Sequence, residues 1–108
     1  MVIRKIIMEA TMESIEMIKV RSFSDEEKQK ALEIFSDISI EEQNALIKID
    51  LFQEQDIPTD FIVCIHWDEN GIKKVSDISE KLIAALKNYG WISYSIWNPL
   101  STINREIC

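Results

Sequence analysis

Short stretches rich in apolar and β-branched residues, one of them alternating with charged residues, predict four strands, and two longer stretches with apolar residues at helical spacing predict two helices. The predicted strands span residues 15–23, 45–53, 61–67 and 91–97, and the predicted helices span residues 24–37 and 77–89. The resulting order, β-α-β-β-α-β, is typical of the ferredoxin-like arrangement, in which two helices cover one face of a four-stranded antiparallel sheet. We therefore expect an α+β fold.

Each predicted helix begins with a capping box, in which a hydroxyl or carboxyl side chain is followed three residues later by an acid. Ser24 and Glu27 form the first box, and Asp77 and Glu80 form the second. Gly90 suits the left-handed position just after the second helix. The apolar faces that should pack on the sheet consist of Ala31, Leu32, Phe35 and Ile38 in the first helix, and of Ile78, Leu82, Leu86 and Tyr89 in the second.

The predicted strands carry apolar side chains on both sides, because successive side chains of a strand point in opposite directions. In strand 61–67, one side carries Phe61, Val63, Ile65 and Trp67, and the other carries Ile62, Cys64 and His66. In strand 91–97, one side carries Trp91 and Trp97, and the other carries Ile92, Tyr94 and Ile96. In strand 45–53, one side carries Ala45, Ile47, Ile49 and Leu51, and the other carries Leu46, Lys48, Asp50 and Phe52.

Two helices can cover only one side of this sheet, so something else should bury the other side. Each large apolar side chain left in water forgoes roughly 1.5–3 kcal/mol of stabilisation, and a patch of them marks an interaction surface. We expect a second copy of the chain to cover the side with Ile62, Ile92 and Ile96, which gives a homodimer. The alternative is that residues 1–13 or 99–108 fold back over this side.

The two ends of the chain are less clearly patterned than its centre. Residues 1–13 fit a helix and a strand about equally well, since short apolar runs do not settle that choice. Residues 99–108 follow the stop signal Asn98-Pro99 and are expected to form a loose tail. We interpret residues 1–108 as one domain whose core spans about residues 15–98.

The composition argues against several classes of protein. Twelve Lys and Arg against 19 Asp and Glu in 108 residues give a net charge of −7, whereas sequence-independent nucleic-acid binding needs clustered cations. The longest apolar runs have five residues, but a membrane-spanning helix needs roughly 20 and a secretory signal about 7–15. Two cysteines, Cys64 and Cys108, are too few for a secreted disulfide scaffold. We expect a cytoplasmic protein that binds neither membranes nor nucleic acid.

Two short motifs connect the predicted fold with a known family. Strand 61–67 ends in Ile65-His66-Trp67-Asp68, a helix follows, and the last strand begins with Gly90-Trp91-Ile92-Ser93. In these features the chain resembles the antibiotic biosynthesis monooxygenase-like domains of the dimeric α+β barrel superfamily, over about residues 15–98. The resemblance implies a homodimer in which two sheets form a barrel, with a pocket in each subunit between its sheet and its helices.

The resemblance also implies a type of chemistry, the cofactor-independent oxidation of a small aromatic substrate. Trp67 matches the tryptophan that lines the pocket in active members, and Phe35, Leu82 and Leu86 would then wall the pocket. No metal and no organic cofactor is implied. The haem-degrading branch of the superfamily adds an asparagine on the first strand and a histidine after the tryptophan. This chain has neither, which argues against haem degradation.

His66 is the only histidine and is therefore the candidate catalytic proton shuttle. Alternation points it away from Trp67, toward the expected dimer face, and a structural role is the competing interpretation. His66 also stands where the family has a glutamate or an arginine, a departure that weakens the case for family-style chemistry. Cys64 fits a small buried hydrophobe better than a nucleophile. One histidine and two scattered cysteines give no zinc-ligand spacing, so no metal site is expected.

Three functions remain open at this point. The first is a small oxygenase, which requires an apolar cavity with a polar group aimed into it. The second is a non-catalytic dimeric module that binds a small ligand or a partner protein. This function agrees better with the absence of the polar pocket residues that active members of the family have. A regulatory ferredoxin-like domain that senses metabolites is a third interpretation.

Overall fold

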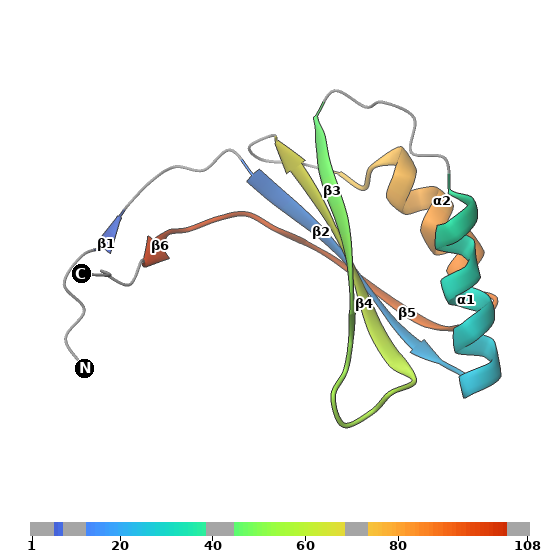
Figure 1. Cartoon of the computed structure of the whole chain (residues 1–108). Helices are drawn as coiled ribbons and strands as arrows, with labels where there is room; N and C mark the ends of the chain where they lie inside the picture. The colour runs from blue at the N-terminus through green and yellow to red at the C-terminus, as the bar shows by residue number, and fades with distance from the viewer. Residues whose placement is uncertain (1–5, 8–12, 39–44, 69–73, 104–108) are drawn as a thin grey trace.

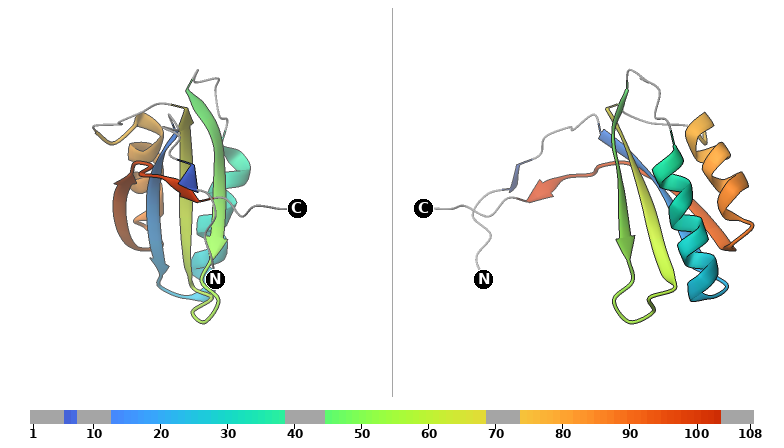
Figure 2. Two further views of the ribbon diagram at one scale, coloured as in Figure 1. Left: turned by 90° about the vertical axis from the view of Figure 1, so that its left-hand side faces the viewer. Right: turned by 45° about the vertical axis from the view of Figure 1, so that its right-hand side comes forward.

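A computed structural model of the chain confirms the predicted order of strands and helices (Figure 1). It describes residues 6–7, 13–38, 45–68 and 74–103. The main sheet consists of β2 (Glu13–Ser22), β3 (Leu46–Gln53), β4 (Asp60–Asp68) and β5 (Gly90–Trp97), in the antiparallel order β3-β4-β2-β5. The helices α1 (Asp25–Asp37) and α2 (Asp77–Leu86) cover the same face of this sheet (Figure 2). Two short strands, β1 (Ile6–Ile7) and β6 (Thr102–Ile103), form a separate pair.

The apolar core lies between the helices and the sheet. Its buried side chains are Ile18, Val20, Ala31, Phe61, Val63, Ile65, Trp67, Leu82 and Leu86. The side of β4 that carries Trp67 is therefore the side that faces the helices. No helix in the described part of the chain is both long and apolar enough to span a membrane.

The side of the sheet away from the helices is called the open face below. It is formed by alternate residues of the four strands: Glu13, Ile15, Met17, Lys19 and Arg21 of β2; Lys48, Asp50 and Phe52 of β3; Asp60, Ile62, Cys64, His66 and Asp68 of β4; and Trp91, Ser93, Ser95 and Trp97 of β5. No helix of the described chain covers this face (Figure 2).

The expected composition of the dimer face was wrong in part. Ile62 lies on the open face and shares it with Trp91, but Ile92 and Ile96 lie on the helix side of β5. The cause is the register, which places Ile92 opposite the buried Val20. Alternation assigns side chains to the two sides of one strand, but the pairing between strands decides which sides coincide.

An irregularity in β3 also changes the predicted sides. Ile47 is an extra residue in a β-bulge between Leu46 and Lys48. Leu46 therefore packs against the core together with Ile49 and does not share a side with Lys48. The bulged Ile47 is exposed. The prediction for the start of this strand is wrong because a bulge shifts the alternation by one residue.

The two helix starts differ in how well they were predicted. Ser24 is the N-cap of α1, and its Oγ accepts a hydrogen bond from the backbone nitrogen of Glu27 at 3.1 Å, as predicted. The N-cap of α2 is Ser76, one residue before the predicted Asp77, and its Oγ accepts a hydrogen bond from the backbone nitrogen of Ser79 at 3.1 Å. Asp77 instead lies in the first turn, where its charge suits the positive end of the helix dipole.

Gly90 serves a different purpose from the predicted one. It is the first residue of β5 and not a left-handed cap of α2, which ends at Leu86. A Cβ atom on Gly90 would lie 2.4 Å from the carbonyl oxygen of Arg21 and 2.9 Å from the Cα atom of Ser22. A glycine is therefore needed here because β5 approaches the backbone of β2 closely.

The two ends of the described chain form a paired arm. Ile6 lies opposite Ile103 and Ile7 opposite Thr102, and we call these strands together with residues 98–101 the terminal arm. The arm projects from the end of the sheet where β2 begins and β5 ends, on the side away from the helices (Figures 1 and 2). The radius of gyration is accordingly 16.2 Å, against about 13 Å for a compact chain of this length.

The described part of the arm bears on the predictions for the ends of the chain. Within residues 1–13, Ile6 and Ile7 form a strand, and within the expected loose tail Thr102 and Ile103 form another. The described part of the arm extends away from the open face and does not fold back over it (Figure 2). Residues 1–5, 8–12 and 104–108 lie outside the described residues.

Candidate functional site

A buried carboxylate, that of Glu16, lies on the helix side of β2 and is 0% exposed. Its Oε1 accepts hydrogen bonds from Nε1 of Trp67 at 2.6 Å and from Oγ of Ser76 at 2.5 Å. Its Oε2 accepts hydrogen bonds from the backbone nitrogen of Ser76 at 3.0 Å and from the hydroxyl of Tyr94 at 2.5 Å. Each oxygen thus accepts two hydrogen bonds, which offset the cost of burying the charge.

The fold explains why these groups meet. Glu16 lies in β2, between the strands that supply Trp67 and Tyr94, and all three side chains project toward the helices. Ser76 caps α2, and the start of a helix has unpaired backbone N–H groups and the positive end of the helix dipole. The carboxylate of Glu16 therefore ties three strands to the start of α2.

Burial and hydrogen bonding act in opposite directions on the pKa of Glu16. Burial raises this pKa, but the hydrogen bonds from Ser76 and Tyr94 lower it and prevail, so the carboxyl group titrates below its usual range. The pKa of Tyr94 is raised strongly, first by burial and then by the hydrogen bond to Glu16 and its negative charge. The pair therefore combines an ionised carboxylate with a protonated phenol at neutral pH.

The four residues predicted to line a pocket lie together between the sheet and the helices. Trp67, Leu82 and Leu86 are buried in the core, and Phe35 is partly buried against it. The polar atom of Trp67 already donates its hydrogen to Glu16. The structure thus accounts for these side chains as core packing, and their contact with a substrate stays a prediction.

Sequence reasoning missed the role of Glu16 and its link to Ser76. A signal was present, because alternation places Glu16 in phase with Ile18 and Val20, which are both buried. A charged residue at such an inward position needs partners within the fold. Tyr94 was assigned to one side of its strand, but nothing local indicated that its hydroxyl would reach this carboxylate.

His66 lies on the open face and points away from Trp67, as alternation predicts. Its Nδ1 is 2.5 Å from Oε1 of Glu13, and its Nε2 is 3.1 Å from Oδ2 of Asp50. The side chain is 13% exposed. The hydrogen bond with Glu13 orients the ring, whereas Nε2 makes no hydrogen bond within the described residues. The contact with Glu13 favours a structural role, and a catalytic role stays a prediction.

Cys64 is a buried residue of the open face. Burial and the nearby carboxylate of Asp50 raise the pKa of its thiol, so the thiol stays protonated and unreactive at neutral pH. Cys108 lies outside the described residues. Within residues 6–7, 13–38, 45–68 and 74–103, no group of three or more His, Cys, Asp or Glu side chains is placed to hold a metal ion.

The open face contains two hollows that share Lys19. The larger, of about 550 Å³, is lined by Lys19, Arg21, Trp91, Ile92 and Ser93. The smaller, of about 210 Å³, is lined by Lys19, Phe52, Gln53, Glu54, Asp60, Phe61 and Ile62. Both open on the side of the sheet opposite the predicted pocket.

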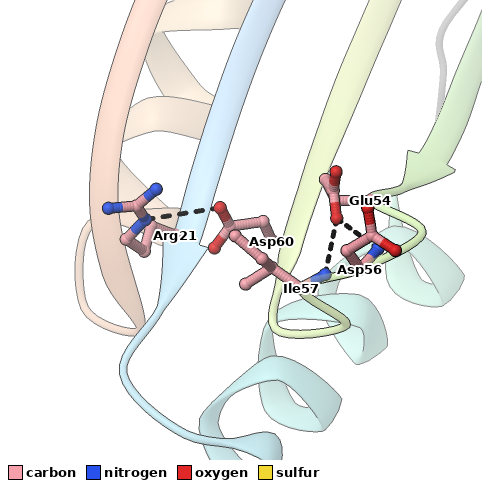
Figure 3. A network of polar contacts seen from close by, with 5 residues as sticks. All are labelled: Arg21, Glu54, Asp56, Ile57 and Asp60. Carbon is pink, nitrogen blue, oxygen red and sulfur yellow. Dashed lines mark hydrogen bonds and ion pairs between the residues drawn. The ribbon is translucent and has the colours of Figure 1, made fainter.

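Polar contacts at this end of the sheet involve Arg21 and the turn between β3 and β4 (Figure 3). The Nε of Arg21 donates a hydrogen bond to Oδ2 of the buried Asp60 at 3.3 Å. In the turn before Asp60, the carboxylate of Glu54 accepts hydrogen bonds from the backbone nitrogens of Asp56 and Ile57, each at 2.5 Å. The ion pair with Asp60 holds Arg21 where it borders the larger hollow.

Comparison with known proteins supports the fold. No protein-family model and no curated protein sequence matches the chain. The structure is similar to that of a conserved protein of unknown function from Bacteroides thetaiotaomicron VPI-5482, described as a possible oxidoreductase, with a TM-score of 0.62 and 15% identity over 82% of this chain and 99% of that one. It is also similar to a conserved protein from Methanosarcina mazei Go1, with a TM-score of 0.64 and 15% identity over 82% of this chain and 94% of that one. At this identity the likeness establishes a shared ferredoxin-like α+β fold and assigns no activity.

Proposed function

We propose that the chain is a homodimeric domain of the dimeric α+β barrel type that binds a small ligand or a partner protein without catalysing a reaction. The supporting observation is that the buried polar cluster is closed. Both oxygens of Glu16 are occupied by donors from the chain itself, and the indole of Trp67 is one of these donors. A substrate would have to displace hydrogen bonds worth about 1.5–3 kcal/mol each, since the acceptor is charged.

The open face supports the homodimer. Trp91 is 65% exposed, Phe52 and Trp97 are also exposed, and Met17 and Ile62 are half-buried between them. Exposed apolar patches mark interaction sites, and aromatic residues are enriched in protein interfaces. Two such faces packed together would remove these side chains from water and form a barrel.

Sedimentation equilibrium from micromolar to submillimolar concentration tests the assembly. The expected result is a reversible dimer, and a single subunit across this range would contradict it.

Binding is tested by screening small aromatic compounds and their anions for a rise in the melting temperature, because a ligand that binds the native state stabilises it. A ligand of a non-catalytic domain is recovered chemically unchanged after incubation in air.

The second candidate function is cofactor-independent oxidation of a small aromatic substrate. It is favoured by the position of the predicted pocket residues beside the buried Glu16–Tyr94 pair and by the description of the Bacteroides protein as a possible oxidoreductase. Oxygen consumption with quinol and anthrone compounds tests it. An oxygenase would show substrate-dependent uptake that Trp67→Phe reduces and that Glu33→Gln, a control at an exposed position of α1, leaves unchanged. No uptake with either class of compound supports the non-catalytic function.

A further inference from the structure

The open face carries little net charge, although the whole chain has a charge of −7. Its cations are Lys19, Arg21 and Lys48, and its carboxylates are those of Glu13, Asp50, Asp60 and Asp68. Three cations against four carboxylates leave a formal charge of −1 with His66 neutral. Two copies of an acidic chain repel each other over most of their surface. Two open faces that meet bring little like charge together, so a second copy of this chain fits the face electrostatically.

The charges on this face are unevenly distributed along the strands. Glu13 of β2 and Asp68 of β4 lie opposite each other and form an acidic end, where the one described cation, Lys48, is paired with Asp50. Lys19 and Arg21 lie toward the other end of β2, and Lys19 is about 20 Å from Glu13 at the rise of an extended strand. Arg21 is paired with Asp60, whereas Lys19 has no ion pair within the described residues. The face therefore has an acidic end and a cationic end.

The terminal arm starts at the acidic end. It projects outward on the side of the sheet opposite the helices, so the arm stands at an angle to the open face and does not cover it (Figures 1 and 2). Leu100 in the arm is 94% exposed, and Trp97 and Ile103 on either side of it are exposed as well. A two-stranded ribbon is marginally stable in water by itself. The arm thus presents apolar side chains that need a second surface.

We propose that a second copy of the chain binds the open face with its strands reversed, so that the acidic end of each copy meets the cationic end of the other. This proposal rests on the homodimer of the proposed function and specifies its arrangement. In a two-fold dimer the same patch serves both copies, so each contact occurs twice. An arrangement with aligned strands would gather Glu13 and Asp68 of both copies at one end. The reversed arrangement places them beside the partner's Lys19 instead.

The reversed arrangement also brings the terminal arm of each copy into contact with the other copy. In the reversed arrangement the two-fold axis lies between the two sheets and perpendicular to the strands. The β5 strands of the two copies then face each other and run in opposite directions. Trp97 and Leu100 at the end of one β5 then lie opposite Trp91 at the start of the other. The hollow of about 550 Å³ beside Trp91 has no occupant within the described chain. The exposed arm of each copy therefore meets the unfilled hollow of the other.

A charge-exchange cycle followed by sedimentation equilibrium tests the arrangement. Lys19→Glu and Asp68→Lys should each weaken the dimer by about tenfold or more, because like charges across an interface repel. The double variant should return to within about threefold of the wild-type dissociation constant, since it restores the pair. Lys81→Glu, an equal charge change at an exposed position of α2, is the matched control and should have little effect.

The two proposals fail in distinguishable ways. If the wild-type chain stays a single subunit, both the homodimer and its arrangement are overturned. If the wild-type chain dimerises but Asp68→Lys tightens the dimer, the strands are aligned, because the substitution has then relieved a cluster of carboxylates. If the effects of Lys19→Glu and Asp68→Lys simply add, the two residues do not meet and the reversed arrangement is wrong.

The arm is tested separately with Leu100→Ser. The arm should lose contact with the hollow of the partner, so the dimer should weaken by several-fold. Urea denaturation at a concentration where the chain is a single subunit should be unchanged, since Leu100 is almost fully exposed there. An unchanged dimer dissociation constant would show that the arm does not contact the partner.

Discussion

Trp67 donates its indole hydrogen to Glu16 at 2.6 Å from a diagonal position on the neighbouring strand. Glu16 lies opposite Ile65, and Trp67 is two residues farther along β4. Diagonal neighbours on adjacent strands lie within reach of long side chains. The same carboxylate accepts two hydrogen bonds from Ser76 at the start of α2. Glu16 is therefore the residue whose loss would disturb the sheet and the helix together.

Glu16→Gln should lower the free energy of unfolding by about 1–3 kcal/mol, because the new amide group faces donors and leaves buried groups unpaired. Urea denaturation measures the effect. Glu33→Gln, at an exposed position of α1, is the control and should stay within about 0.5 kcal/mol of the wild type. Equal stability of the Glu16→Gln variant and the wild type would contradict the assigned role.

The same residue should make stability depend on acidic pH. Its pKa in the folded chain lies below its usual range, whereas an unfolded chain should titrate this group near about 4.3. A lowered folded pKa contributes stability that is fully present above about pH 4.3 and is lost as the pH falls through the folded value. The wild type should thus lose stability more steeply than Glu16→Gln when urea midpoints are measured from neutral pH downward. Parallel curves would exclude this contribution.

Gly90→Ala should destabilise the fold by about 1–3 kcal/mol, the range typical of overpacked sites. The added carbon would meet backbone atoms of Arg21 and Ser22, which cannot move without separating β5 from β2. Thermal or urea denaturation measures the loss. Ser93→Ala, an exposed substitution on the same strand, is the comparison, and equal effects of the two substitutions would argue against the close approach.

Cys64 should be unreactive in the folded chain. Its thiol is buried and its pKa is raised, and only the thiolate reacts quickly with disulfide reagents. In a Cys108→Ser background, a chromogenic thiol reagent should label Cys64 slowly in buffer and rapidly in urea. Similar rates under the two conditions would mean that the open face is accessible to the reagent at this position.

Local chemistry explains which parts of the fold could be predicted. The cap at Ser24 depends on residues within one turn of it, and the two sides of β4 follow from alternation alone. The side that Ile62 shares with other strands depends on register, and the shift at Ile47 depends on a bulge. Neither leaves a local signal. The cytoplasmic location stays a prediction from composition.

The candidate site also has a part that could be predicted from the sequence and a part that could not. The family resemblance implied that Trp67 and Leu82 lie together, and both belong to the buried core. The link between Glu16 and Ser76 joins residues 60 positions apart. It depends on how β2 lies against the start of α2, which no periodicity in either segment specifies. The polar part of the site could therefore be found only in three dimensions.

The pairing of β1 with β6 makes the chain a suitable subject for circular permutation. Ile7 and Thr102 lie side by side in register, so a short peptide from β6 to β1 would close the backbone into a ring. New termini could be opened at residues 55–58, an exposed turn between β3 and β4. Such a permuted protein would retain every strand of the main sheet, and fluorescent labels could be attached at its new ends without altering the terminal arm.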